Sequence, residues 1–546
     1  MIKDFLFHVK YAFLLFPFNR KKHLARKLKE SFGSLKSDTF NFKQIESYFR
    51  KKDHYNAHQV ITDKTCNDLD FDQLFMFLDR TNSRVGQQYY YNKLRTIDVN
   101  PAQTKLNEEL IQTLSKDSDL RIDTQKKLEA LNNKDAYNIT CLFQEEHITP
   151  PKFFFVIKLL SFISLVSLLL AFYNPLFFMV LIGVFCINFV VHYWNKNNLI
   201  PYTGSIPQLL KLNNIAANLH LNPLFQKINP NLSVSIKFIN AVKSKMFFFQ
   251  LEAKLQGEFE VILWFVFELF KIMFLIEPLL LFDVLKKLDT KRNEIENVYT
   301  FIGHLDMLIS IASLRHGLDT YCFPDINKGL VIKANQIAHP LIQDCTTNNV
   351  EISDKSILLT GSNMSGKTSF IRTIGINVIT GLTINTCFAK SMSFPLLKIF
   401  SAIRINDDLI NNKSYYFEEV VTIKEMLKES HNGSQNLFLL DELFKGTNTV
   451  ERIAAGKAVL SELAKNNNKI LVATHDIELT DLLSNQFDLY HFSETVENEK
   501  VGFDYKLKEG KLKNRNAIKI LEMNKYPSGV VHEAIEISKQ LDKKYS

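Results

Sequence analysis

Hydrophobic and polar residues are arranged in three patterns along this chain, and the first covers residues 37–150. This segment is polar. Between residues 69 and 94 its apolar side chains recur three or four positions apart, as one face of a helix requires. The side chains that set this spacing are Leu74, Phe75, Phe77, Leu78 and Val85. Because no strand-like alternation is found here, we predict an amphipathic helical segment.

The second pattern is a pair of long apolar runs, residues 153–172 and 176–193, separated by the turn residues 173–175. As helices, both runs are about one bilayer thickness long. The turn carries no charge, whereas lysines lie near the other ends of the runs, at Lys152, Lys158 and Lys196. By the positive-inside rule, this distribution predicts a transmembrane hairpin over residues 153–193 with both ends in the cytoplasm. A helical hairpin buried in protein is the alternative.

Residues 258–283 are also strongly apolar, but charges interrupt them. Glu268 and Lys271 are spaced to pair on a helix, Glu277 follows, and Pro278 would kink a helix. A third membrane span would place the parts of the chain before and after it on opposite sides of the membrane. We therefore expect one long amphipathic helix here, in contact with the bilayer at most.

The third pattern begins near residue 326, where short apolar runs alternate with helical stretches. This alternation is typical of a doubly wound α/β domain, and its expected buried strands are residues 357–360, 437–440 and 470–473. The chain is therefore expected to be multidomain. The expected parts are a basic, amphipathic amino-terminal segment (1–40), a first helical part (41–150), the hairpin (151–196), a second helical part (197–325) and the α/β domain (326–546).

Composition and charge change this picture little. With 546 residues the chain is too long for one hydrophobic core. Its formal charge of +8 is mild, and we interpret it as surface lysine more than as a binding site for a polyanion. The six cysteines are scattered without metal-ligand spacing, which is typical of a reduced, cytosol-facing protein.

The amino terminus does not have the order of a secretory signal, because its apolar patch, residues 5–18, precedes the basic run, residues 20–29. It is either an amphipathic helix that lies on a membrane or a short helix packed on the core.

A phosphate-binding loop is the strongest chemical signal in the sequence. The segment 361–368 reads GSNMSGKT, follows a predicted strand and precedes an apolar-periodic helix that begins at Ser369. Such a loop wraps backbone N–H groups around phosphates at a helix N-terminus. Lys367 is expected to reach the β- and γ-phosphates of ATP, and Thr368 to hold Mg²⁺. The residues expected to bind the nucleotide are Gly361, Ser362, Asn363, Met364, Ser365, Gly366, Lys367, Thr368 and Ser369.

Two further strands end in residues that suit ATP hydrolysis. Residues 436–442 read NLFLLDE, an apolar strand that ends in an acidic pair, as a Walker B segment does. Asp441 would hold Mg²⁺ through water, and Glu442 would polarise the attacking water. A third strand ends at His475, which we interpret as a sensor of the γ-phosphate at the carboxyl edge of the sheet. Lys367, Glu442 and His475 are thus the candidate catalytic residues.

Residues 326–525 resemble the ATPase domain of the MutS mismatch-repair family. The resemblance is carried by six elements in order: His339-Pro340, the loop at 361–368, Asp407-Asp408-Leu409 with Ser414 to Glu419, the run 441–449, the run 474–480, and the strand pair at 503–510. Taken alone, residues 407–419 would be read as a solvated loop. More weakly, residues 78–86 and 305–324 resemble the helical core of that family.

The resemblance implies an ABC-type P-loop ATPase that uses ATP and Mg²⁺ and works as a homodimer through its ATPase domains. It also implies that Ser414 completes the partner's site in trans and that Asn363 contacts phosphates. No counterpart of the family's mismatch-reading domain precedes residue 60, and no nuclease tail is expected. The hairpin takes the place of part of the core and clamp.

Two functions are therefore considered. The first is a membrane-tethered MutS-like ATPase of the mismatch-repair family that binds mismatched or branched DNA in an ATP-dependent way. The alternative is a membrane ATPase that has lost DNA binding and acts on a protein or lipid partner. A transporter ATPase is disfavoured because the signature element expected between Ser414 and Asp441 is absent. In either case we expect the inner (cytoplasmic) membrane, with the soluble domains facing the cytoplasm.

Overall fold

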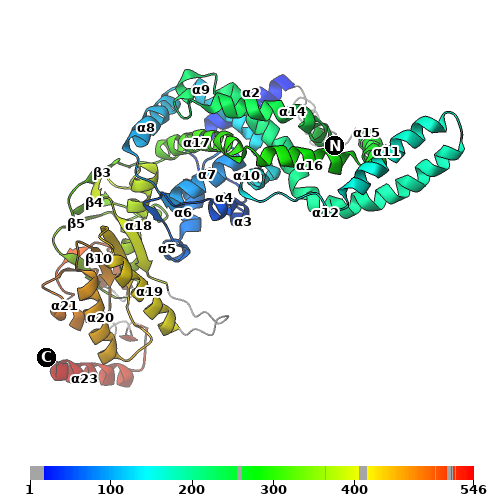
Figure 1. Cartoon of the computed structure of the whole chain (residues 1–546). Coiled ribbons are helices and arrows are strands. Elements are labelled where there is room, and N and C mark those ends of the chain that lie inside the picture. The colour runs from blue at the N-terminus through cyan, green and yellow to red at the C-terminus, as the bar shows by residue number, and fades with distance from the viewer. Residues whose placement is uncertain are drawn as a thin grey trace, which may run out of the picture. The chain divides into compact units, whose positions relative to one another are not determined.

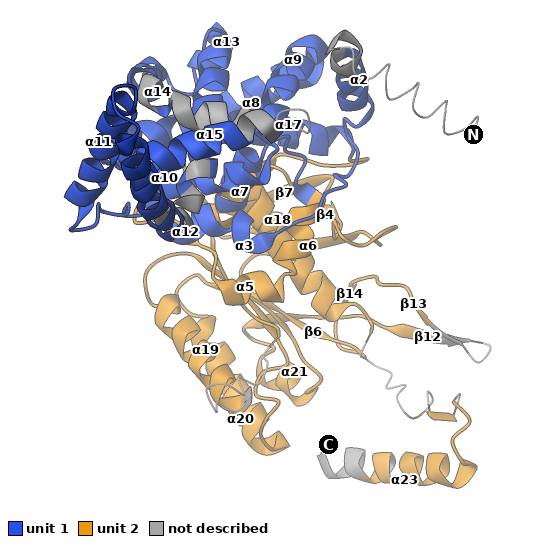
Figure 2. Ribbon diagram, turned by 90° about the vertical axis from the view of Figure 1, so that its right-hand side faces the viewer, with its two compact units in different colours: residues 1–53, 78–92, 101–317 blue, residues 54–77, 93–100, 318–546 orange. Residues whose placement is uncertain are grey.

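The structure is a computed structural model that describes residues 17–254, 261–362, 364–404, 415–497, 500–512, 518, 521–522 and 524–545. It consists of two compact units (Figure 2). Unit 1 comprises residues 1–53, 78–92 and 101–317, and unit 2 comprises residues 54–77, 93–100 and 318–546. Some residues named above lie outside the described residues: residues 5–16 of the apolar patch, residues 258–260, Asn363, Asp407, Asp408, Leu409 and Ser414.

Unit 1 is helical. Its helices are α2 (Pro17–Glu30), α3 (Phe42–Ile45), α4 (Ser47–Lys51), α7 (Arg84–Arg95), α8 (Pro101–Lys116), α9 (Ser118–Leu128), α10 (Cys141–Gln144), α11 (Phe154–Ala171), α12 (Leu176–Leu219), α13 (Pro223–Gln226), α14 (Leu232–Lys254), α15 (Val261–Phe274), α16 (Ile276–Asp289) and α17 (Arg292–His316). Two short 3₁₀ helices, Glu129–Leu131 and Lys134–Thr140, join α9 to α10. The central helix is α17, which is buried over most of its length.

A buried carboxylate ties α17 to the start of α7. Asp306 accepts hydrogen bonds from the backbone N–H of Asn82 (2.9 Å) and Ser83 (2.8 Å) and from the Ser83 hydroxyl (2.6 Å). Burial raises the pKa of Asp306, although these hydrogen bonds act in the opposite direction. A Cβ at Gly86 would lie 2.2 Å from an Asp306 oxygen, so glycine is needed for this approach. The segments 78–86 and 305–324 therefore meet at Asp306.

The amphipathic pattern over residues 69–94 does not form one helix. The structure has α6 (Phe71–Leu78) and α7, and the chain turns between them. Ser83 caps α7 by accepting a hydrogen bond from the N–H of Gly86 (2.9 Å), and Asp79 accepts one from the N–H of Thr81 (2.9 Å). Short polar side chains that bond to nearby backbone favour caps and turns over a helix interior, which explains the break.

The two long apolar runs form α11 and the first part of α12, which project from the other helices of unit 1 as a hairpin (Figure 1). Both helices are long and apolar enough to cross a membrane. Phe154–Ala171 has a mean hydropathy of 2.5 and is 17% buried, and Leu176–Trp194 has a mean hydropathy of 2.3 and is 22% buried.

The expectation of one long helix over residues 258–283 is corrected. Within the described residues this segment forms α15 and α16, which are separated at Leu275. Leu275 adopts a left-handed conformation with φ 47°. Pro278 then lies in the first turn of α16, where its missing N–H costs no helical hydrogen bond. The proline therefore starts a new helix instead of kinking a continuous one.

Unit 2 contains a six-stranded sheet in the order β14-β11-β6-β10-β9-β8. Its strands are β6 (Ser356–Thr360), β8 (Lys398–Ala402), β9 (Asn436–Asp441), β10 (Lys469–Ala473), β11 (Phe487–His491) and β14 (Lys508–Glu509). All pair in parallel except β14, which is antiparallel to β11. The three expected buried strands are β6, β10 and β9, and they lie side by side in the centre of this sheet.

A second sheet has the order β3-β7-β4-β5. Its strands are β3 (Pro324–Asn327), β4 (Ile332–Ile337), β5 (Asn348–Ile352) and β7 (Ser391–Pro395). Two small antiparallel pairs complete the strands: β1 (Gln59–Val60) with β2 (Thr96–Ile97), and β12 (Glu494–Glu497) with β13 (Lys500–Phe503). The helices of unit 2 are α5 (Asp63–Asp68), α6, α18 (Lys367–Ile384), α19 (Tyr415–Ser430), α20 (Thr449–Leu463), α21 (Glu478–Leu482) and α23 (Ser528–Tyr545).

The early segment 54–77 packs on the sheet of unit 2 through Asp68 and Leu69. Asp68 accepts hydrogen bonds from the Ser401 hydroxyl (2.6 Å) and from the backbone N–H of Arg404 (2.7 Å). Leu69 lies against Gly375 of α18, where an added Cβ would be 3.3 Å from a Leu69 methyl. Residues far apart in sequence thus share one core beside the loop 361–368.

Candidate functional site

The loop 361–368 joins β6 to α18 with two glycines in left-handed conformations. Gly361 has φ 149° and Gly366 has φ 105°. A Cβ at Gly361 would lie 2.7 Å from the carbonyl oxygen of Phe492, so the loop passes close to backbone here. These two glycines let the chain turn from a buried strand into the first turn of α18, which leaves the N-terminus of that helix facing the loop.

Lys367 folds back over its own loop. Its Nζ donates to the carbonyl oxygens of Gly361 (2.8 Å) and Ser362 (2.9 Å), and the residue is only 4% exposed. Burial lowers the pKa of Lys367, and the neighbouring carboxylates Asp441 and Glu442 partly oppose this effect. The ammonium group is thus held at the centre of the loop by two neutral acceptors.

Thr368 and Asp441 meet directly. The Thr368 hydroxyl donates to Asp441 Oδ2 (2.6 Å). The other oxygen, Asp441 Oδ1, is buried and accepts no hydrogen bond from any residue that the structure describes. Burial raises the pKa of Asp441, and the bond from Thr368 partly offsets this. A hydroxyl beside a carboxylate oxygen with spare acceptor capacity fits the hard oxygen ligands that Mg²⁺ prefers.

Glu442 and His475 face each other across the ends of β9 and β10. Glu442 Oε1 lies 2.9 Å from His475 Nε2, and Glu442 Oε2 lies 2.5 Å from Lys445 Nζ. Burial alone would raise the pKa of Glu442, but the bonds from His475 and Lys445 and their charges lower it to about 2. His475 Nε2 is also 3.5 Å from Lys367 Nζ. The three candidate catalytic residues are therefore in one cluster.

The backbone at Glu442 is left-handed, with φ 53°. Its N–H donates to the carbonyl of Ala473 (2.9 Å), which ties β9 to β10 at this point. Left-handed backbone is uncommon for a residue other than glycine, and it is often retained at functional sites. Here it directs the Glu442 side chain away from the strand and toward His475.

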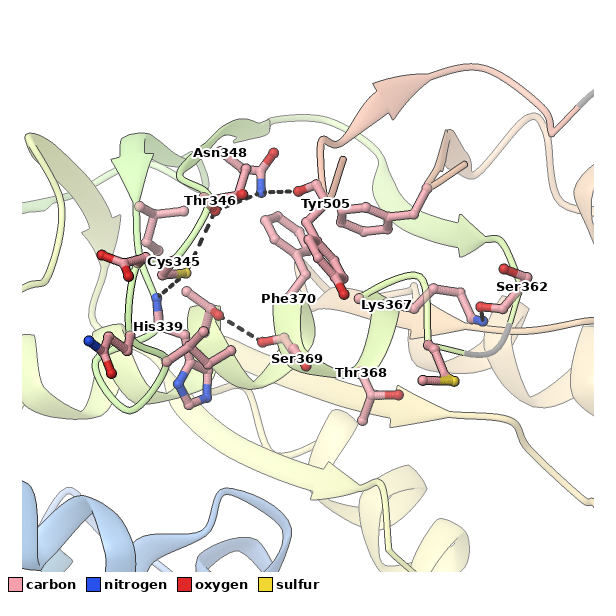
Figure 3. Close-up of a pocket in the computed structure, with 18 of the residues that line it drawn as sticks. His339, Cys345, Thr346, Asn348, Ser362, Lys367, Thr368, Ser369, Phe370 and Tyr505 are labelled. Atoms are coloured by element: carbon pink, nitrogen blue, oxygen red, sulfur yellow. Dashed lines mark hydrogen bonds between the residues drawn. The ribbon is translucent and has the colours of Figure 1, made fainter. Parts of the chain in front are cut away.

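A cavity of about 470 Å³ lies beside the loop (Figure 3). Figure 3 shows His339 and Cys345 on one side of it and Lys367 on the other. Tyr505 and Phe370 contribute aromatic rings, and the Tyr505 carbonyl is held by Asn348 Nδ2 (3.0 Å). A cavity of this size with aromatic walls and a few polar groups suits a small ligand such as a nucleoside.

His339 is a buried member of this wall. Its Nδ1 accepts a hydrogen bond from the N–H of Leu341 (3.3 Å), which requires the unprotonated nitrogen. Burial, together with the nearby guanidinium of Arg372, lowers the pKa of His339 to about 4. The His339 side chain of the His-Pro element thus forms an uncharged part of the cavity wall.

The remaining loop residues play different parts. The Ser365 hydroxyl donates to the Ser362 carbonyl (2.8 Å), which closes the loop on itself. Met364 is left-handed, with φ 69°, and 82% exposed, and it is one of the residues that line the cavity. Ser369 lines the cavity together with Thr368.

Two residues near the site, Glu494 and Arg452, had no signal in the sequence. Glu494 accepts a hydrogen bond from the Ser362 hydroxyl (2.5 Å). Arg452 of α20 makes a two-pronged bond to Asp476 (2.9 and 2.6 Å), the residue after His475. These contacts come from segments that follow the recognised motifs, so only their packing brings them to the site.

Glu419 is buried behind the acidic pair. Its carboxylate accepts a hydrogen bond from the N–H of Phe444 (2.5 Å). Burial raises the pKa of Glu419, while the bond from Phe444 and the charge of Lys445 lower it in part. Phe444 is itself left-handed, with φ 59°. Glu419 therefore holds the shape of the turn that follows Glu442, two residues from the reacting cluster.

Comparison with known proteins gives a consistent result. Residues 357–542 match the family MutS domain V. The chain is 31% identical over 272 residues to the DNA mismatch repair protein MutS of Aquifex pyrophilus, with 48% of this chain and 31% of the relative covered. It is 31% identical over 257 residues to the MutS protein homolog 4 of Homo sapiens, with 44% of this chain and 27% of the relative covered. The match spans about a third of the length of these curated relatives.

Proposed function

This chain belongs to the MutS family, and on that premise we propose that unit 2 binds ATP with Mg²⁺ and hydrolyses it. One observation carries the proposal. Leu359, Ala473 and Asp441 are in register on the adjacent strands β6, β10 and β9. The parallel strands therefore deliver the loop lysine, the acidic pair and the histidine to the same edge of one sheet, where ligands bind in open α/β sheets.

Different parts of the nucleotide would bind to the cavity and to the loop. The base and ribose would occupy the space of about 470 Å³ lined by Phe370 and Tyr505, and the phosphates would lie over the N-terminus of α18. Lys367 would then exchange its two neutral carbonyl acceptors for phosphate oxygens. A charged acceptor makes a stronger hydrogen bond than a neutral one, so phosphate favours this exchange.

Thr368 and Asp441 would hold Mg²⁺ beside the phosphates. When bound, the ion would neutralise charge on the β- and γ-phosphates. Their present hydrogen bond of 2.6 Å puts both side chains in one place before any ligand arrives. The spare buried oxygen of Asp441 gains from a cation or its water shell, because a buried acceptor without a partner is destabilising.

Glu442 would orient the attacking water, and His475 would bind the γ-phosphate. A carboxylate with a pKa near 2 is a weak base. Phosphoryl transfer through a loose transition state mainly requires that the attacking water is positioned. The ionised carboxylate of Glu442 can do this by accepting a hydrogen bond from the water. His475 contacts both Glu442 and Lys367, so a phosphate that draws His475 away would free Glu442 for the water.

The test is the substitution Lys367→Ala, with Lys333→Ala as the matched control. Lys333 is an exposed lysine paired with Glu351 on the second sheet. We expect Lys367→Ala to abolish ATP binding and turnover in the full chain, and Lys333→Ala to leave both unchanged. Wild-type ATPase activity in Lys367→Ala would refute the assignment of the site.

We further propose that α11 and the first part of α12 anchor the chain in a membrane, with both units on the cytoplasmic side. The supporting observation is that these two apolar helices are only 17% and 22% buried within the protein. Exposed apolar surface of this extent marks a membrane or partner site. We expect the expressed full chain to stay in the membrane pellet after extraction at alkaline pH. Recovery of a monodisperse protein without detergent would contradict the anchor.

ATP-dependent DNA binding completes the proposal, because two of the relatives are named for DNA mismatch repair or as a MutS homolog. The alternative is an ATPase that acts on a protein or lipid partner. The two are separated by measuring affinity for mismatched, branched and fully paired DNA at several salt concentrations, with and without ATP. Salt-dependent binding supports the first function, and its complete absence at low salt leaves the alternative.

A further inference from the structure

Helix α15 lies along both helices of the hairpin. Its outer face is apolar and exposed, at Phe265 (56%), Val266 (56%), Leu269 (37%) and Phe270 (49%). The hairpin helices that flank it expose side chains of the same kind, among them Phe162 at 63%. Helix α15 therefore adds to the exposed apolar surface of α11 and α12.

Polar side chains of the hairpin cap the carboxyl end of α15. The Ser161 hydroxyl donates to the carbonyl of Phe274 (2.7 Å), and Asn188 Nδ2 donates to the carbonyl of Met273 (2.7 Å). Carbonyls in the last turn of a helix have no partner within the helix. In hydrocarbon such groups must be satisfied by protein, because no water is present. Two polar residues within apolar helices thus supply what a helix end inside a bilayer needs.

Helices α15 and α16 run in opposite directions beside the hairpin. Phe274, at the end of α15, bonds to Ser161, whereas Phe282 of α16 packs edge-on against Phe154 with ring centroids 5.3 Å apart. Phe154 is the first residue of α11, and Ser161 lies seven positions further along it. At 1.5 Å per residue, the turn at Leu275 is about 10 Å deeper along α11 than Phe154. The chain therefore returns along α16. It approaches the turn along α15, because Glu268 contacts His192 whereas Met273, five residues later, bonds to Asn188, which is closer to the turn of the hairpin.

The charges that interrupt this segment are buried and paired. Lys271 Nζ lies 2.6 Å from Glu268 and 3.3 Å from Glu277, and its side chain is 0% exposed. His192 of α12 contacts Glu268 (3.3 Å) and Glu277 (3.9 Å). Ionisable residues inside membranes face the protein interior and pair with one another. The four residues satisfy this condition and leave only apolar side chains on the outer face of α15.

An open groove of about 480 Å³ lies between α11 and the turn at Leu275. Its walls are mostly apolar, and Lys158 supplies a charge among them. An acyl chain would fill such a groove while its phosphate head group approached the lysine, whose long apolar stem allows it to reach toward the head-group region. The groove is therefore suited to lipid.

From these contacts we propose that α15 and α16 form a re-entrant helical hairpin, which enters the bilayer from the same side as the ends of α11 and α12 and turns back at Leu275. Lipid acyl chains cover the face formed by Phe265, Val266, Leu269 and Phe270. This inference rests on the proposed membrane anchor. It places an apolar, charge-bearing segment in the membrane without a third crossing, so the chain before and after it stays on one side.

The test is photo-crosslinking to lipid in the full chain reconstituted into phosphatidylcholine vesicles that carry a labelled acyl chain. Para-benzoylphenylalanine replaces one phenylalanine at a time. Phe270 tests α15, Phe162 is the reference on α11, and Phe323 is the control in unit 2, where it is 48% exposed. We expect label transfer at positions 270 and 162 and none at 323. All three substitutions exchange one exposed aromatic ring for a larger one, which limits their effect on folding.

The outcomes separate the two proposals. Label transfer at position 162 with none at 270 overturns the re-entrant hairpin and keeps the anchor, whereas transfer at neither position overturns both. A protease site inserted after Leu221, which is 77% exposed, and one at the carboxyl terminus distinguish re-entry from a third span. Cleavage of both sites by protease added to one side supports re-entry, and protection of one site alone overturns it.

Discussion

At the scale of single residues, the charged side chains of the site are bonded to one another or to carbonyls of the loop. Lys367 is bonded to loop carbonyls, and Glu442 is bonded to His475 and Lys445. A phosphate would compete for the cations and leave Glu442 free to hold water. The residues that we propose to carry the chemistry were all identified from sequence, because a glycine-rich loop and an acidic pair are local patterns. Their pairing could not be found, since it depends on the register of β6, β9 and β10.

Glu442→Gln tests the role of this carboxylate. The amide keeps the shape and loses the charge that orients water, so we expect ATP to bind and single-turnover hydrolysis to slow by about 100-fold or more. Glu462→Gln is the matched control, because Glu462 is a partly exposed glutamate paired with Lys465 on the surface. Turnover at the wild-type rate in Glu442→Gln would argue against the assigned role.

The lowered pKa of His339 predicts that unit 2 loses folding stability in acid. The folded pKa of about 4 lies below the ordinary value of 6.5, so the unfolded chain binds the extra proton first as pH falls. Stability is therefore full above about pH 6.5 and declines toward pH 4, by up to about 3 kcal/mol. His339→Gln should remove this slope, which thermal unfolding at a series of pH values measures. Equal slopes in both proteins would contradict the prediction.

At the scale of elements, helix starts and stops were predicted less well than strands. The buried strands are short continuous apolar runs, and their short length favours a strand over a buried helix segment. The break between α6 and α7 depends on Asp79 and Ser83 bonding to nearby backbone. The break at Leu275 depends on Ser161 and Asn188, which come from distant helices. Periodicity contains no information on such partners.

Gly86→Ala tests the start of α7. An alanine Cβ would meet Asp306 at 2.2 Å, so the buried carboxylate and its four donors on Asn82 and Ser83 would have to move. We expect a loss of about 1–3 kcal/mol of stability, as for other overpacked sites, seen as a lower melting temperature. Gly529→Ala, with open space around the added methyl, should melt as the wild type does. An unchanged melting temperature in Gly86→Ala would show that Asp306 does not hold α7.

Asn188→Leu tests the cap on α15. Leucine fills a similar volume but cannot bond to the carbonyl of Met273 or to Ser164. In the membrane such a loss is expected to cost about 1 kcal/mol, measured as faster proteolysis between α15 and α16 in mild detergent. Phe189→Leu, at an exposed neighbouring position, is the control. Equal cleavage rates in the two variants would show that Asn188 does not stabilise the carboxyl end of α15.

At the scale of the whole molecule, this chain combines two features in one sequence. One is the domain V match at residues 357–542, and the other is a pair of exposed apolar helices in unit 1. We propose that ATP in unit 2 is coupled to a second copy of the chain, whose Ser414 would complete the site. That residue lies outside the described part of the chain, so the proposal rests on the family resemblance.

Mixing two inactive variants tests the shared site. Lys367→Ala removes the loop lysine, and Ser414→Ala removes the residue donated to the partner. Each heterodimer would then keep one intact site. A one-to-one mixture with random pairing should recover about a quarter of the wild-type ATPase rate, since half of the dimers are heterodimers with one of two sites intact. A mixture as inactive as either variant alone would exclude sharing through Ser414.

The sequence by itself determined the loop at 361–368, the acidic pair, the histidine after β10, the central strands and the two apolar helices. Each of these is a local pattern whose meaning depends on neighbouring residues in the chain. Only the tertiary structure decided that Glu442 is held by His475 and Lys445, that Asp306 supports α7, and that the charges near Lys271 neutralise one another. These are contacts between distant segments, and their geometry is set by packing, which no periodicity encodes.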